Sequence, residues 1–205
     1  MRCVNCGAFS LRTICAACAA NLAECRLSMR QVEGFSVFYY YGYSEIRELI
    51  LSKHHEYGAA VLARIASLSL AKFPLHLQRE ISANPQNYET FKTDGIFKFN
   101  AVPLDDDARS GYSHTAILAR ALKSELIEPK FHCLRAQNRV KYTGQSLEFR
   151  LKHKRNFKIL TPPQFPVILV DDIITSGLSM LQARESLIDG GFMPVCGLVL
   201  ANAKE

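Results

Sequence analysis

The residues best suited to chemistry stand between positions 171 and 179, where two adjacent carboxylates precede hydroxyls grouped around one glycine. They are Asp171, Asp172, Thr175, Ser176, Gly177, Leu178 and Ser179. Carboxylates accept hydrogen bonds from hydroxyls, so the vicinal diol of a ribose would suit the pair. The loop after them can donate backbone N–H groups and hydroxyl hydrogens to a phosphate. The stretch therefore predicts a site for a phosphorylated sugar.

Two acids beside a phosphorylated ligand create a repulsion that calls for a cation. A unit-charge contact at about 4 Å costs roughly 4 kcal/mol at an effective dielectric of about 20. A divalent cation would remove this penalty, and oxygen ligands favour Mg²⁺. A ligand with a 5-phosphate, a ribose diol and a pyrophosphate bound to Mg²⁺ would satisfy the whole group.

The segments on either side indicate how this group is positioned. Residues 167–170 form a short apolar run rich in β-branched side chains, which is typical of a strand buried on both faces of a parallel sheet. Residues 180–187 have helical spacing, and two glycines at 190 and 191 would end that helix. The polar loop would then lie between the end of a strand and the start of a helix, where α/β proteins bind ligands.

The apolar strand followed by Asp-Asp-Ile-Ile-Thr-Ser-Gly-Leu-Ser resembles the phosphoribosyl pyrophosphate (PRPP) motif of type I phosphoribosyltransferases, most closely in the ComF family of competence proteins. The resemblance implies an α/β fold with a mostly parallel sheet flanked by helices, and a PRPP site that uses Mg²⁺. It also implies a role with incoming single-stranded DNA and with proteins of the DNA-uptake machinery. The alternative is a flavodoxin-like or Rossmann-like domain, but neither a G-x-G-x-x-G nor a P-loop sequence occurs.

Four cysteines form a second motif near the N-terminus. They are two Cys-x-x-Cys pairs, made of Cys3, Cys6, Cys15 and Cys18. Two such pairs can hold Zn²⁺ tetrahedrally, and the metal would stabilise a segment too short to build its own core. A redox pair is the alternative reading, and Cys25 could replace one ligand. ComF-like proteins begin with a similar module, so we expect a structural zinc site. Cys133 and Cys196 lie in apolar runs and are expected to be buried thiols.

A third stretch, residues 96–113, is expected to form a strand, a loop and the start of a helix. In type I phosphoribosyltransferases the equivalent loop holds the pyrophosphate, which the resemblance would assign here to Asp105, Asp106, Asp107 and Arg109. The chain departs from the ComF pattern Arg-Gly-Phe-Asn-Gln, because it reads Ser-Gly-Tyr-Ser-His from 110 to 114. A solvated acidic turn is the alternative.

The fourth stretch, residues 135–158, is basic. It carries eight Lys or Arg against one acid, Glu148, a local +7 in a chain whose net charge is +6. We expect it to meet a polyanion, as the phosphoribosyltransferase lid or a groove for single-stranded DNA; a solvated helix at 147–155 is the third reading. The residues assigned to these roles are Arg139, Lys141, Arg150, Lys152, Lys154 and Arg155.

The remaining segment, 26–95, is expected to connect these parts. Residues 35–43 are aromatic and β-prone, and favour a hairpin packed on the core over a base-stacking surface. Ser44 could cap a helix through residue 52, a second helix would span 59–71, and 74–95 would be a long loop. Lys53 and Gly58 match an element of the ComF family loosely.

The sequence thus predicts a zinc knuckle at 1–27, a connecting subdomain at 28–94 and a phosphoribosyltransferase-like domain at 95–205. No run of 18 apolar residues and no secretory signal is evident, so a cytoplasmic location, or a peripheral one at the inner membrane, is expected. Whether the chain is an enzyme stays open, because no general base is evident. The alternatives to a ComF-like role are an active phosphoribosyltransferase acting on a small acceptor and a PRPP-sensing regulatory module.

Overall fold

The computed structural model describes residues 1–104, 111–138 and 155–204. The helices are α1 (Ala16–Ala23), α2 (Tyr43–Leu51), α3 (Gly58–Leu68), α4 (Phe73–Ala83), α5 (His114–Arg120) and α7 (Leu178–Asp189), with short 3₁₀ segments η1 (Ser52–His54), η2 (Leu70–Lys72), η3 (Pro85–Asn87) and η4 (Glu89–Phe91). The strands are β1 (Ser28–Val32), β2 (Phe35–Tyr39), β3 (Tyr41–Gly42), β4 (Lys92–Thr93), β5 (Ile96–Phe97), β6 (Phe99–Pro103), β7 (Ile127–Pro129), β8 (Leu134–Ala136), β9 (Phe157–Ile159), β10 (Val167–Ile174) and β11 (Pro194–Asn202).

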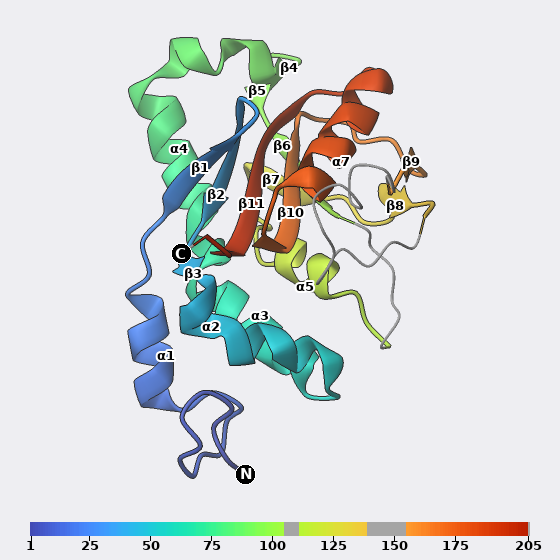
Figure 1. Cartoon of the computed structure of the whole chain (residues 1–205). Coiled ribbons are helices and arrows are strands. Elements are labelled where there is room, and N and C mark those ends of the chain that lie inside the picture. Colours follow the sequence, from blue (N-terminus) through green and yellow to red (C-terminus); the bar gives the residue numbers. More distant parts are fainter. Residues whose placement is uncertain (105–110, 139–154, 205) are drawn as a thin grey trace.

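A mostly parallel sheet forms the centre of the molecule (Figure 1). Its order is β1-β2-β11-β10-β6-β7, with β3 also paired to β11, and only the β1–β2 pair is antiparallel. This confirms the coarse prediction of an α/β fold with a mostly parallel sheet flanked by helices. The predicted domain boundaries stay predictions, but β2 and β3 belong to the same sheet as β10 and β11.

The side chains of β10 alternate between two cores, as the two-residue period of a strand requires. Ile168 and Val170 pack with apolar side chains from α3, α4 and α5. Val167 and Leu169 pack on the opposite face with α7 and with strands β8 and β9. A strand covered by helices on one face and by α7 on the other explains why the sequence here is continuously apolar rather than alternating.

The hairpin of β1 and β2 forms one edge of the sheet. Its two turn residues, Glu33 and Gly34, both have positive φ (47° and 76°), which matches the right-handed twist of the flanking strands. The aromatic run after the turn is buried, with Phe35, Tyr39 and Tyr41 in the core. This confirms the preference for a packed hairpin over an exposed base-stacking surface.

Several expectations about local structure were wrong. Residues 74–95 are not one long loop, because α4 occupies Phe73–Ala83 and buries Phe73, Leu77 and Ile81, which stand four residues apart on one helical face. Its proline lies in the first turn, where a missing N–H costs nothing. Ser44 does not cap α2: the N-cap is Gly42, whose N–H donates to the Glu45 carboxylate at 2.9 Å.

Residues 130–137 contain the short strand β8, which does not join the main sheet. β8 pairs with β9 in a separate two-stranded ladder, and β7 is the strand that lies beside β6. β11 covers Pro194–Asn202. The prediction of two buried thiols is confirmed, because Cys133 and Cys196 are both buried.

Within the described residues one stretch, Gly58–Ala83, is long and apolar enough to cross a membrane by length and composition. In the structure it consists of α3, η2 and α4, and Ser69 interrupts it with non-helical backbone angles (φ −124°, ψ −76°). Its apolar side chains, such as Leu62, Ile65 and Phe73, lie in the core. It is weak evidence for a membrane span, because core helices pass the same test.

Candidate functional site

The two acids lie within β10 rather than after it, because the strand continues to Ile174. The prediction that the strand ends at residue 170 was therefore wrong by four residues. The neighbouring strand β6 ends where Pro103 pairs with Val170, whereas β11 continues alongside β10 as far as Asn202. Asp171 and Asp172 thus stand beyond the last residue of β6, at the carboxyl edge of the sheet, where ligands of α/β proteins bind.

Asp172 is buried and is paired with a cation from a distant part of the chain. Its side chain lies on the same face of β10 as Val170, and its Oδ2 accepts a short hydrogen bond from Nζ of Lys53, in η1. The side chains of Lys53 and Asp172 are only 20% and 5% exposed. Because buried carboxylates require compensation, Lys53 is the group that makes an ionised Asp172 tolerable here.

The pKa values of the two neighbouring acids are shifted in opposite directions. Burial opposes ionisation of Asp172, but the charges of Lys53 and His114 outweigh it and hold its pKa below the usual value. Burial, followed by the charge of Asp172, raises the pKa of Asp171 to about 8. Lys53 in turn has a raised pKa, because the two carboxylates outweigh its own desolvation. In the ligand-free site the surroundings therefore favour the ionised form of Asp172 and the protonated form of Asp171.

His114 joins these acids to form a group that could hold a metal ion. One ligand atom from each of His114, Asp171 and Asp172 lies within 4.8 Å of the other two. His114 is the first residue of α5, whose N-cap Ser113 accepts a hydrogen bond from the N–H of Ala116 at 3.1 Å. Imidazole and carboxylate oxygens are both competent ligands for divalent cations, so the residues present fit such an ion.

The loop after β10 turns sharply into α7. Gly177 is the N-cap of α7 and has a left-handed conformation, with φ of 87°. A Cβ added there would lie 2.5 Å from Cγ1 of Val32, so glycine is required both by the backbone angle and by the close approach of β1. Ser176 Oγ lies 3.5 Å from the N–H of Leu178. The loop that carries the predicted hydroxyls and the first turn of the twelve-residue helix α7 therefore lie at the carboxyl edge of the sheet.

The helical segment that carries Lys53 is locked to the strand-loop-helix that carries His114. The Tyr112 hydroxyl donates to the carbonyl oxygen of Lys53 at 2.9 Å. A Cβ on Gly58 would lie 2.4 Å from that hydroxyl and 2.2 Å from the carbonyl oxygen of Ser52, so only glycine fits. Lys53 and Gly58, which match the family element loosely, therefore both lie against the Tyr112 hydroxyl, and of the two it is Lys53 that contacts an acid.

The four N-terminal cysteines converge and could hold a metal ion such as zinc. One sulfur from each of Cys3, Cys6, Cys15 and Cys18 lies within 4.8 Å of the others. Backbone N–H groups of Cys15, Cys6 and Asn5 overcome the burial of Cys3 and lower its thiol pKa to about 6, which favours the thiolate that binds metal. Gly7, with φ of 73°, makes the turn between the first pair and the rest of the knuckle. Cys25 is not part of this group.

Most of the predicted pyrophosphate and polyanion residues lie outside the described residues. These are Asp105, Asp106, Asp107, Arg109, Arg139, Lys141, Arg150, Lys152 and Lys154. Of the basic group the structure places Arg155, whose backbone N–H donates to Oε1 of Gln182 on α7 at 2.9 Å. It also places Arg135 directly opposite Lys158 on the β8–β9 ladder, and both side chains are exposed.

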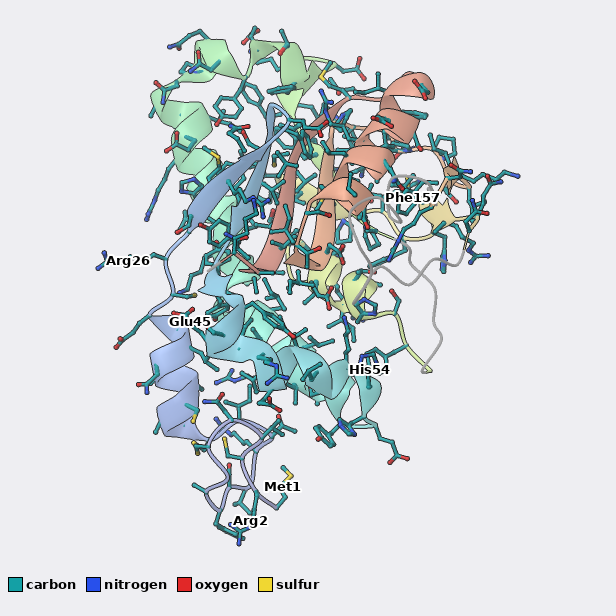
Figure 2. The ribbon with its side chains drawn as sticks, in the orientation of Figure 1. Met1, Arg2, Arg26, Glu45, His54 and Phe157 are labelled. Atoms are coloured by element: carbon teal, nitrogen blue, oxygen red, sulfur yellow. The ribbon has the colours of Figure 1, made fainter. Side chains whose placement is uncertain are left out.

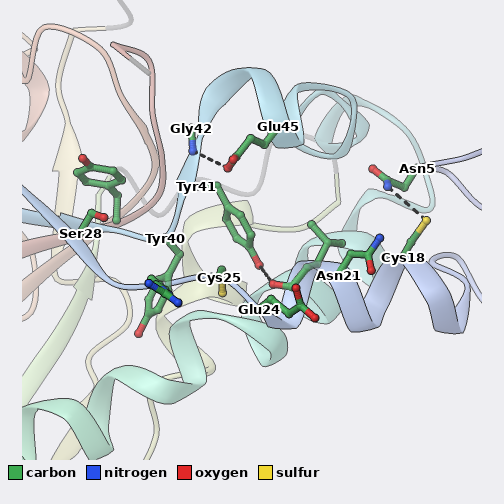
Figure 3. Close-up of a pocket in the computed structure, with 13 residues that line it drawn as sticks. Asn5, Cys18, Asn21, Glu24, Cys25, Ser28, Tyr40, Tyr41, Gly42 and Glu45 are labelled. Carbon is green, nitrogen blue, oxygen red and sulfur yellow. Dashed lines mark hydrogen bonds between the residues drawn. The ribbon is translucent and has the colours of Figure 1, made fainter.

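A separate pocket of about 510 Å³ lies between the knuckle, β2 and α2 (Figure 3). Tyr40, Tyr41 and Cys25 line it together with Asn5 and Glu45, and the Tyr41 hydroxyl donates to the carbonyl oxygen of Leu22 at 2.8 Å. This pocket contains none of the predicted phosphate-site residues. The cavity and the predicted site are thus different places in the fold.

Three site residues gained their roles only from the structure. In the sequence Lys53 is a loose motif match and His114 is a departure from a pattern. Arg30, whose guanidinium donates to the carbonyl oxygen of Thr175 at 2.8 Å, gave no signal at all. Each lies far along the sequence from the acids or the loop that it contacts, for example 119 positions between Lys53 and Asp172. No local spacing rule could have joined them, because the contacts are created by the order of strands in the sheet.

The chain was also compared with known proteins. No family model matches it, and no curated protein matches it. The resemblance to the ComF family therefore rests on the motifs of this sequence.

Proposed function

We propose that this protein binds PRPP together with Mg²⁺ at the carboxyl end of β10, as a ComF-like protein of natural competence. The observation that carries the proposal is the meeting of two acids and a glycine-containing hydroxyl loop at a strand-to-helix junction of a parallel sheet. Few ligands need both an anion-binding loop and a pair of carboxylates. A sugar phosphate with a free diol needs both.

In this proposal each part of the group has a distinct role. Asp171 and Asp172 accept hydrogen bonds from the ribose hydroxyls, and the 175–179 loop donates its amides and hydroxyls to the 5-phosphate. Ligand binding favours the ionised form of Asp171, because a hydroxyl donor and a nearby cation both stabilise a carboxylate. The fixed charge of Lys53 already lowers the repulsion between the acids and a phosphorylated ligand.

His114, Asp171 and Asp172 would hold Mg²⁺, which would neutralise negative charge on the ligand's pyrophosphate. The four cysteines would hold Zn²⁺ as a structural ion, because a site closed by four thiolates leaves no open position for catalysis. Both assignments rest on the side chains present.

The role with single-stranded DNA rests on the ComF resemblance and on the basic segment. Its described part supplies one local argument: Arg135 and Lys158 face each other across an antiparallel pair and are exposed. Like charges in that position repel each other, and an anion such as a DNA phosphate would relieve the repulsion. A cytoplasmic protein that works with the DNA-uptake machinery would encounter both PRPP and single-stranded DNA.

Ligand-induced thermal stabilisation tests the proposal. PRPP with Mg²⁺ at about 100 times its Kd should stabilise the protein by about 2.7 kcal/mol and raise Tm by about 5–10 °C. Asp171→Asn with Asp172→Asn should remove the shift, while Asp189→Asn, an exposed acid at the end of α7, should keep it. If the wild-type protein shows no shift and no heat of binding by calorimetry, the proposal fails. Pyrophosphate released with one acceptor would identify an enzyme rather than a binding protein.

A further inference from the structure

Arg30 links the edge hairpin to the loop that follows β10. Its Nη1 donates to the carbonyl oxygen of Thr175 at 2.8 Å and to Oδ1 of Asn202 at 3.2 Å. Asn202 is buried at the end of β11, and its Oδ1 also accepts from the N–H of Lys204 at 3.2 Å. A single guanidinium therefore ties β1 to the ends of both central strands.

The contact with Thr175 has a consequence for the next amide. A trans peptide is planar, and its C=O and N–H point in opposite directions. Because the Thr175 carbonyl is directed at Arg30, the N–H of Ser176 is directed away from the hairpin. The guanidinium thus sets the direction of one of the amides on which phosphate binding depends.

A second residue of the same strand supports the same loop. Val32 stands two positions after Arg30, so both side chains lie on one face of β1. Val32 is buried and fills the space that a Cβ on Gly177 would occupy. Arg30 and Val32 together hold both ends of the turn from Thr175 to Gly177, one by charge-assisted hydrogen bonding and the other by packing.

We infer that Arg30 is a positioning residue of the phosphate loop. Its guanidinium holds residues 175–177 in the conformation whose amides face the ligand, and it does so without touching the ligand itself. The inference rests on the proposed function for its ligand, a ribose phosphate, but the positioning itself is a property of the ligand-free protein. The hairpin is then a structural part of the site rather than only the edge of a sheet.

Amide hydrogen exchange of the zinc-loaded, ligand-free protein tests the positioning directly. Arg30→Ala should speed exchange at least tenfold at the amides of Leu181 and Ala203, which donate to the carbonyl oxygens of Gly177 and Ile174 on either side of the turn, while the amides of β10 and the middle of α7 keep their protection. Arg30→Lys should give an intermediate effect, since an ammonium can still reach a carbonyl oxygen. The matched control is Arg26→Ala, which removes the same charge from a side chain that points away from the ribbon (Figure 2). Equal exchange in wild type and Arg30→Ala overturns the inference.

Binding of ribose 5-phosphate, measured by calorimetry with Mg²⁺, provides the second measurement. Loss of a hydrogen bond from a charged group predicts roughly tenfold weaker binding for Arg30→Ala, with no change for Arg26→Ala. Added ethylguanidinium should restore part of the affinity of Arg30→Ala, which general destabilisation would not allow. If the wild type binds neither ribose 5-phosphate nor PRPP, the proposed function fails while the exchange result still decides the positioning. If wild type and Arg30→Ala bind equally well, the positioning role in binding is refuted while the proposed function stands.

Discussion

Lys53 and Asp172 form a buried ion pair that joins the helical segment after α2 to the carboxyl end of β10. The Tyr112 hydroxyl holds the backbone of the same lysine, and His114 lies beside the same carboxylate. The acids of the proposed sugar site are therefore not a free pair at a strand end. One of them is held as an anion by a cation from another part of the chain.

Removing the lysine should destabilise the protein strongly. Lys53→Met leaves Asp172 buried without its cation, and breaking a buried pair in this way costs about 3 kcal/mol. Lys92→Met removes a lysine from the more exposed pair with Glu89 and should cost less than about 1 kcal/mol. Denaturant unfolding of both variants measures the difference. Equal costs would mean that solvent, and not Lys53, compensates Asp172.

Asp171 should make stability depend on pH between about 4 and 8. Its folded-state pKa, about 8, lies above its unfolded value, so the folded state binds the proton more tightly and loses stability as pH rises through this window. The loss approaches about 1.4 kcal/mol per pH unit in the middle of the window. Unfolding curves at several pH values check this for wild type and for Asp171→Asn.

The difference between those two proteins isolates Asp171, since histidines and cysteines titrate in both. Asp172 changes stability with pH in the opposite direction. Because its pKa is lowered in the folded state, it contributes stability above pH about 4, and this stability is lost only as pH falls through its folded-state pKa. Wild type and Asp171→Asn with the same slope between pH 5 and 8 would show that Asp171 is ionised throughout.

The strand, loop and helix of the site could be predicted from the sequence, but the contacts between distant parts of the chain could not. Local chemistry predicted β10 from the apolar run at 167–170, and α7 from the loop glycine before it and the two glycines that end it. The structure contains both elements. The acids were placed after the strand because the continuous apolar run ends at Val170. The structure permits it because β6 ends earlier than β10 and because Lys53 compensates one acid.

The hairpin shows the other limit of local reasoning. The aromatic content of 35–43 predicted a strand packed on the core, but not that β2 pairs with β11. That pairing carries Arg30 and Val32 to the phosphate loop, 145 positions away from Thr175 in the case of Arg30. Similarly, α4 was missed because its polar face dominates the composition, although Phe73, Leu77 and Ile81 repeat every four residues.

The cysteine knuckle should hold one zinc ion per chain. Cys6→Ser should lose that ion and expose residues 1–18 to proteases, since a segment this short has no core of its own. The matched control is Cys25→Ser, which changes a cysteine outside the group of four. Metal analysis and limited proteolysis measure the two effects. Retention of zinc by Cys6→Ser together with its loss from Cys25→Ser would move the ligand set to include Cys25.

Alanine at Gly177 should test how closely the hairpin constrains the phosphate loop. Gly177→Ala combines a left-handed backbone, worth about 1–2 kcal/mol, with a contact against Val32 that is too short for a real Cβ. Gly191 has a similar φ of 80° but open space around its Cα, so Gly191→Ala should incur the backbone cost alone. The excess cost of Gly177→Ala therefore measures the packing of β1 on the loop.

Val32→Ala should remove that excess when it is combined with Gly177→Ala, because the shorter side chain makes room for the new methyl group. The double variant would then be less destabilised than the sum of the two single variants, as measured by denaturant unfolding. Strict additivity would show that the cost of Gly177→Ala does not come from contact with Val32. In that case the packing of Val32 would not be what holds the Gly177 end of the loop, and the hydrogen bond from Arg30 to Thr175 would be the remaining contact between β1 and the loop.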